Sequence, residues 1–129
     1  MIQFHLEAQS GVPTYLQLVQ QVRQAVRFGV LRPGDQLPTV KEVVSSLTIN
    51  PNTVLRAYRE LDVEGLVEGR RGVGTFIAQG VTSLPVDEVK ALRSSLQQWV
   101  ARARAAGFDD ETLHALFADT IRPRIARVA

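Results

Sequence analysis

Two arginines and an asparagine recur at helical spacing between residues 52 and 59. Asn52, Arg56 and Arg59 share one side of a helix, because each residue advances by about 100°. An apolar stripe lies on the other side: Val54, Ala57, Tyr58 and Leu61. An arginine fork can hold a guanine edge and an asparagine amide an adenine edge. The exposed side therefore carries donors that suit the major groove of DNA, and a solvated helix face is the plain alternative.

The helix that positions these donors is predicted to follow a shorter helix after a tight turn. Asn50 can cap it, Pro51 can occupy its first position, and Gly65 can end it. Thr39 and Glu42 fit the capping box of the shorter helix, whose apolar residues continue to Leu47.

Further elements are predicted on either side of this pair of helices. An amphipathic helix begins at Thr14, where Thr14 and Gln17 also fit a capping box, and continues to about Gly29. Two short strands, residues 66–68 and 75–78, surround a glycine-bearing tip. This order predicts an α+β fold, a winged helix-turn-helix DNA-binding domain over residues 1–80.

Other polar residues near these elements are candidates for contacts with the DNA backbone. Asn50 and the backbone amides at its helix tip can hold a phosphate, with Thr53 at the edge of the same face. Lys41 lies on the polar side of the shorter helix. In an extended wing Arg70 and Arg71 point in opposite directions, so one can meet DNA while the other lies against the protein.

Four segments between residues 13 and 78 carry recognisable motifs: Pro13–Leu18, Leu31–Thr39, Asn50–Tyr58 and Gly72–Phe76. In order and separation they resemble the motifs of the GntR regulators. The resemblance implies a DNA-binding dimer that represses transcription until a small-molecule effector, unidentified here, changes its operator affinity. It places the following residues at DNA-contacting positions: Lys41, Asn50, Asn52, Thr53, Arg56, Arg71 and Gly72. Lys41 stands where arginine is more frequent in the family, and Leu55 stands where arginine or serine is frequent, which predicts a shifted operator preference.

The second segment, residues 81–129, is predicted to be an α-helical dimerisation segment. Apolar residues recur there at alternating spacings of three and four, which is typical of a helix seam: Val89, Leu92, Leu96, Trp99 and Ala103. The seam can pack against the chain's own last helix, against a second copy, or against both. Length and motifs together resemble the short YtrA-like branch of the family, whose C-terminal helices dimerise.

The composition limits the remaining functions. The net charge is only +2, so an argument for nucleic acid depends on where the cations lie. With no cysteine and no apolar run of membrane length, we expect a cytoplasmic protein without a membrane span. His5 and His114 have no partner at a recognisable ligand spacing, and no nucleophile, base and orienting group occur together. We therefore expect no metal, cofactor or enzymatic activity. The alternative function is a winged-helix module that binds protein and lacks sequence-specific DNA binding.

Overall fold

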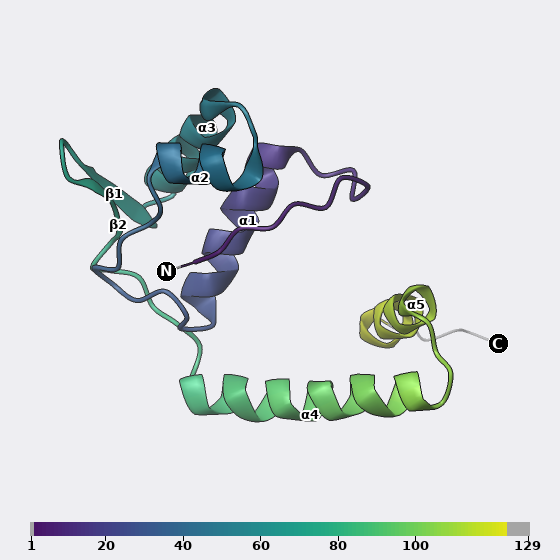
Figure 1. The fold of residues 1–129 in the computed structure, drawn as a ribbon. Coiled ribbons are helices and arrows are strands. Elements are labelled where there is room, and N and C mark those ends of the chain that lie inside the picture. The colour runs from purple at the N-terminus through teal and green to yellow at the C-terminus, as the bar shows by residue number, and fades with distance from the viewer. Residues whose placement is uncertain (1, 124–129) are drawn as a thin grey trace. The chain divides into compact units, whose positions relative to one another are not determined.

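The computed structural model describes residues 2–123, which form helices and one antiparallel hairpin (Figure 1). The elements follow in this order: α1 Thr14–Arg27, α2 Val40–Leu47, α3 Pro51–Val63, β1 Val67–Arg70, β2 Gly74–Ile77, α4 Val86–Ala105 and α5 Asp110–Ile121. They divide into two compact units, residues 1–86 and 87–129. The first unit is a winged helix, as the sequence predicts.

The core of the first unit lies among α1, α2, α3 and the hairpin. Its innermost side chains are almost wholly removed from solvent and are contributed by all three helices and both strands: Leu18, Val19, Val22, Val43, Val54, Leu61, Val67 and Ile77. The apolar stripe predicted for α3 is confirmed as buried. Burial of one side of α3 leaves the opposite side, with its polar residues, at the surface.

The predicted capping box at the start of α1 is wrong. Pro13 precedes the helix, and no side chain caps it. Gln17 turns instead to the preceding loop, where its amide nitrogen donates to the carbonyl oxygens of Glu7 and Val12. The side chain of a glutamine can bond to several backbone groups of a segment that folds back on the helix. In a capping box it would bond to only one backbone N–H group, so it makes more hydrogen bonds with the loop.

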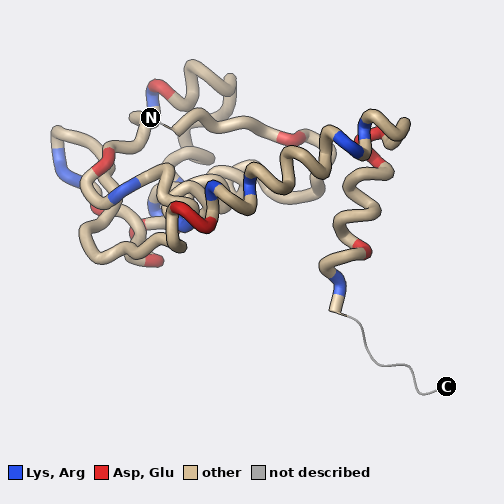
Figure 2. The backbone as a smooth tube through the Cα atoms, turned by 90° about the horizontal axis from the view of Figure 1, so that it is seen from below, with Lys and Arg blue, Asp and Glu red and all other residues tan. Residues whose placement is uncertain are grey.

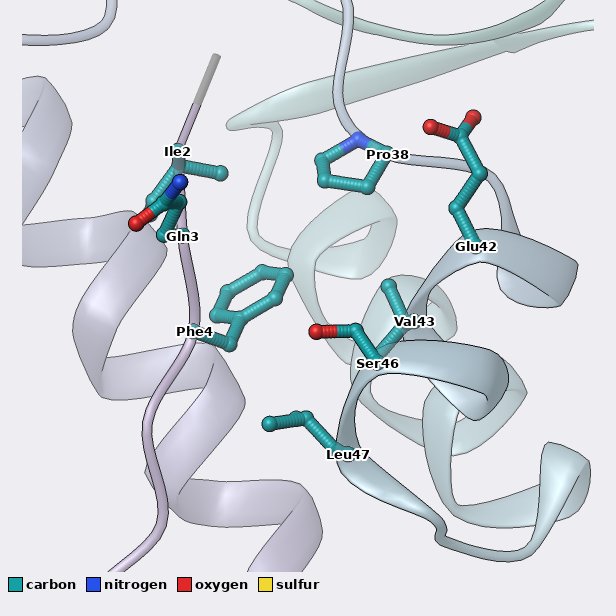
Figure 3. Close-up of a pocket in the computed structure, with 8 residues that line it drawn as sticks. All are labelled: Ile2, Gln3, Phe4, Pro38, Glu42, Val43, Ser46 and Leu47. Carbon is teal, nitrogen blue, oxygen red and sulfur yellow. The ribbon is translucent and has the colours of Figure 1, made fainter.

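An extended arm precedes α1 and lies along it. Ile2, Phe4 and Leu6 alternate with exposed residues and pack against the core. This arm is not among the elements predicted from the sequence, although its alternation of apolar and polar residues is the signal of an extended segment. Between the arm and α2 is a hollow of about 360 Å³, across which the ring of Phe4 points toward α2 (Figure 3).

The wing is a two-stranded sheet with a third segment at its edge. Val67 pairs with Ile77 and Arg70 with Gly74 in an antiparallel register. On the other edge of β2, the backbone of Asp35 and Leu37 exchanges hydrogen bonds with residues 75 and 77. The wing is therefore anchored to the segment that leads into α2, and its tip projects from the helices (Figure 1).

The second unit consists of most of α4, followed by α5, which turns away from the line of α4 (Figures 1 and 2). Asp109 caps α5 by accepting a hydrogen bond from the amide of Thr112. Hydrogen bonding from the side chain of Thr112, together with that amide, lowers the pKa of the Asp109 carboxyl group. Ala103 and Leu113 are buried, whereas Leu92 is 67% exposed and Leu96 45% exposed. The predicted seam is thus buried near the turn and open at Leu92 and Leu96, while Val89 and Trp99 are half-buried.

Candidate nucleic-acid interface

The turn between α2 and α3 sets the position of the candidate recognition helix. The capping box predicted for α2 is confirmed: the Thr39 hydroxyl oxygen accepts a hydrogen bond from the Glu42 amide, and the Glu42 carboxylate accepts one from the Thr39 amide. Thr48 ends α2 in the left-handed conformation, at φ 53°. The left-handed residue turns the chain so that Asn50 lies at the start of α3, where its side chain accepts a hydrogen bond from the amide of Asn52.

The amides at the tip of α3 are not free for a phosphate, contrary to the sequence-based expectation. Pro51 has no amide hydrogen, Asn52 donates to the Asn50 side chain, and Thr53 donates to the Asn50 carbonyl oxygen. The residues that make a well-capped helix start use up its first donors. A phosphate contact at this tip would therefore have to come from side chains.

The side chains of the first turns of α3 lie together at the surface. Asn52, Arg56 and Arg59 are exposed on the side opposite the buried stripe, and Thr53 is half-buried at its edge. A shallow hollow of about 390 Å³ is lined by residues of α1, α3 and the turn: Thr14, Tyr15, Asn50, Asn52, Thr53 and Arg56. Thr14 and Tyr15 were missed as site residues, because nothing local in the sequence places the start of α1 beside α3.

Arg56 is stacked on an aromatic ring. Its guanidinium carbon lies 3.8 Å from the centre of the Tyr15 ring. A stacked guanidinium keeps its N–H groups in its own plane, so the edge that hydrogen-bonds to a base remains available. Arg56 is therefore exposed to solvent but held in place on one face.

The two wing arginines have different surroundings. Arg70 stacks over the ring of Phe76, with its guanidinium carbon 4.3 Å from the ring centre. Arg71 and Gly72 are exposed at the tip, where Gly72 has φ 76°. Of the two cations, Arg70 lies against the protein, and Arg71 occupies the turn that projects from it.

Tyr58 connects the recognition helix to the entrance of α2. Its hydroxyl donates a hydrogen bond of 2.5 Å to the carbonyl oxygen of Pro38. Burial, assisted by the charge of Glu42, raises the pKa of Tyr58 well above its ordinary value. Lys41 is exposed on α2. The hydrogen bond fixes the helix that bears Lys41 against α3.

Residues 14–77 match the family model described as bacterial regulatory proteins, gntR family. The chain is also 38% identical over 110 residues to the HTH-type transcriptional repressor YtrA of Bacillus subtilis, which covers 84% of this chain and 85% of YtrA. The chain belongs to the GntR family.

Solved structures of GntR proteins agree with this placement. YtrA from Sulfolobus acidocaldarius, a GntR-family transcription factor, is 28% identical to this chain with a TM-score of 0.57, covering 79% of this chain and 97% of that structure. The DNA-binding domain of AraR, solved in complex with operator ORE1, is 26% identical with a TM-score of 0.50, covering 60% of this chain and 95% of that domain. This GntR chain is accordingly a DNA-binding transcription regulator with a winged helix.

Positive charge in this GntR regulator is concentrated in small local clusters. Lysines and arginines are interspersed with carboxylates in both units (Figure 2). The polar cluster at the start of α3 and the wing tip therefore supply local positive charge on a nearly neutral molecule. Among residues 2–123, none of the helices combines the length and apolar character required to cross a membrane.

Proposed function

We propose that this GntR regulator is a homodimeric repressor that binds an inverted-repeat operator through the exposed side of α3. The observation that carries the proposal is the cluster of Asn52, Thr53 and Arg56 at the start of α3. Residues at the start of the second helix of a helix-turn-helix reach base edges in the major groove. The relatives support repression, because YtrA of Bacillus subtilis is described as a transcriptional repressor.

Helix and wing contribute different contacts in this proposal. Arg56 reads a base edge, because its fork is exposed near the start of α3. Arg71 meets phosphate or the minor groove from the exposed wing tip. Lys41, Asn50, Asn52, Thr53 and Arg59 complete the proposed interface. Arg70 stacks on Phe76, so in this proposal it stabilises the wing and does not contact DNA directly.

The second unit supplies the dimer interface. Apolar side chains remain exposed on both of its helices, with Leu92 at 67%, Phe117 at 43% and Ile121 at 63%. Isolated exposed apolar residues are ordinary, but several on one small unit indicate a surface that a partner covers. A second copy of the chain would place two copies of α3 about a two-fold axis, which matches inverted half-sites.

The alternative function, binding of protein without sequence-specific DNA binding, is less well supported. It predicts a partner over the side of α3 that carries Asn52, Arg56 and Arg59. The likeness to AraR domains solved on operator DNA favours DNA at that surface. A small-molecule effector, cytoplasmic location and the absence of enzymatic activity remain predictions.

The proposal is tested by selecting duplexes from a random DNA pool and then titrating variants against the selected sequence and a scrambled one. Selection should return an inverted repeat with half-site centres about one DNA turn apart, or a small multiple of it. Arg56→Ala should lose about 1 to 3 kcal/mol on the selected sequence and relax one base-pair preference. Arg71→Ala should weaken both sequences and lower the slope of log affinity against log salt by about 1.

Arg27→Ala is the matched control. Arg27 is an exposed arginine at the far end of α1, about 18 Å from Tyr15 along the helix axis. The Arg27→Ala variant removes the same charge as Arg56→Ala without changing the proposed interface, so its affinities for the selected and the scrambled sequence should both stay close to wild type. Selection of no sequence, or an Arg56→Ala variant with unchanged discrimination between the two duplexes, would contradict the proposal.

A further inference from the structure

The start of α1 brings an aromatic ring to the arginine that reads DNA in the proposed function. Tyr15 is in the first turn of α1, and Arg56 is in the second turn of α3. The Tyr15 ring is half-buried and packs against the core, whereas Arg56 is exposed. A rigid element therefore supports the ring on one side, and a flexible charged side chain covers it on the other.

Arginine has the most to gain from such a support. Its side chain loses about 1.5 to 2 kcal/mol of rotamer freedom when it is fixed in one place. A side chain that is already held near its bound position loses less conformational entropy on binding, and binding is tighter as a result. A cation over a tyrosine face at an exposed site gains about 0.5 to 1 kcal/mol, enough to bias Arg56 toward one orientation.

The geometry also preserves the recognition edge. The guanidinium carbon lies over the ring, 3.8 Å from its centre, and the donors of a stacked guanidinium lie in its own plane, parallel to the ring. A salt bridge to a carboxylate would instead consume two of those donors. Stacking holds the arginine and leaves its fork open.

We propose that Tyr15 is a positioning residue for sequence recognition: its ring orients the Arg56 fork before DNA arrives. This proposal rests on the assignment of Arg56 to a base edge in the proposed function. It adds to the DNA-binding surface a residue of α1 that need not touch a base. The contribution depends on the aromatic face, because that face is what the guanidinium contacts.

The test compares Tyr15→Phe, which keeps the aromatic face, with Tyr15→Leu, which keeps apolar bulk and removes the face. Each full-length variant is titrated against the sequence selected by the wild type and against its single base-pair variants. Tyr15→Leu should reduce discrimination about two- to fivefold at the base pair that Arg56→Ala relaxes, and nowhere else. Tyr15→Phe should retain the wild-type discrimination. Thermal unfolding of both variants verifies that they are folded.

A double variant separates positioning from a general loss of structure. In the Arg56→Ala background, Tyr15→Leu should produce no further loss of discrimination, because the side chain that the ring orients is gone. Additive losses, an equal loss in Tyr15→Phe, or wild-type discrimination in Tyr15→Leu would each overturn the proposal. Higher affinity in Tyr15→Leu would also overturn it, since the ring would then hold Arg56 away from DNA.

Failure of this proposal is distinguishable from failure of the proposed function. If Arg56→Ala keeps its discrimination, the assignment of Arg56 to a base edge is wrong, whatever Tyr15 does. If Arg56→Ala loses discrimination and Tyr15→Leu does not, Arg56 reads a base without help from the ring. If Tyr15→Leu is unfolded, Tyr15→Met, which also removes the aromatic face, takes its place: the proposal requires the loss of discrimination in Tyr15→Met and wild-type discrimination in Tyr15→Phe.

Discussion

Tyr58 joins α3 to the entrance of α2 through one hydroxyl group. That hydroxyl is buried and donates to the Pro38 carbonyl oxygen. We expect Tyr58→Phe to lower the free energy of unfolding by about 1 kcal/mol, because the carbonyl oxygen loses its partner. Urea unfolding measures the loss. Tyr15→Phe, which removes a hydroxyl from a half-buried ring, is the control and should cost less.

The same group makes stability depend on alkaline pH. Burial raises the pKa of Tyr58 in the folded protein, so the folded state keeps its proton where the unfolded state releases it. This contribution is complete below the unfolded pKa of about 10 and is lost progressively as the pH rises above it. Unfolding between pH 9 and 11 should therefore show a steeper decline in wild type than in Tyr58→Phe. Equal slopes would contradict the assignment to Tyr58.

Local signals in the sequence identify the helices well and their long-range partners poorly. The starts of α2 and α3 are predicted correctly because Thr39, Glu42, Asn50 and Pro51 act within one turn of chain. Helix α1 begins at Thr14 as predicted, but its capping box is predicted wrongly, because Gln17 bonds to a loop that folds back on it.

The candidate site shows the same division between local and distant information. Helical periodicity alone places Asn52, Arg56 and Arg59 at the surface, and the structure confirms this. The ring beneath Arg56 belongs to another helix, so only the packing of α1 on α3 reveals it. Hydrophobic patterning indicates which face of each helix is buried, but not which residues of two helices meet.

The conformation of the wing requires glycine at position 74. Gly74 has φ 142°, and a Cβ atom there would lie 2.6 Å from the Gln36 amide nitrogen, which bonds to the Val73 carbonyl oxygen. Gly74→Ala should therefore lower the free energy of unfolding by about 1 kcal/mol or more. It should also weaken binding to selected and scrambled DNA alike, because the wing tip moves.

Gly69→Ala is the matched control within the same hairpin. A Cβ atom at Gly69 meets nothing within 4 Å. Its unfolding free energy and DNA affinity should stay close to wild type. If both alanine variants behave alike, the special requirement at Gly74 is wrong.

Assembly of the whole molecule is proposed to depend on the open part of α4. Leu96→Asp places a charge among exposed apolar side chains that a second copy would cover, so the variant should sediment as a monomer. Ser94→Asp is the control, since position 94 lies on the opposite side of α4 and should leave the wild-type dimer intact. A monomeric wild type at micromolar concentration would exclude the proposed assembly.

The glutamines that hold the arm have a consequence for how salt affects this regulator. The Gln21 side chain both donates to and accepts from the backbone of His5, and Gln17 does the same with Glu7. Amides carry no charge, so the strength of these hydrogen bonds does not depend on salt concentration, unlike that of contacts to DNA phosphates. Raising ionic strength should release DNA while the arm stays docked. A salt titration of binding then counts the ions displaced from DNA and not a rearrangement of the protein.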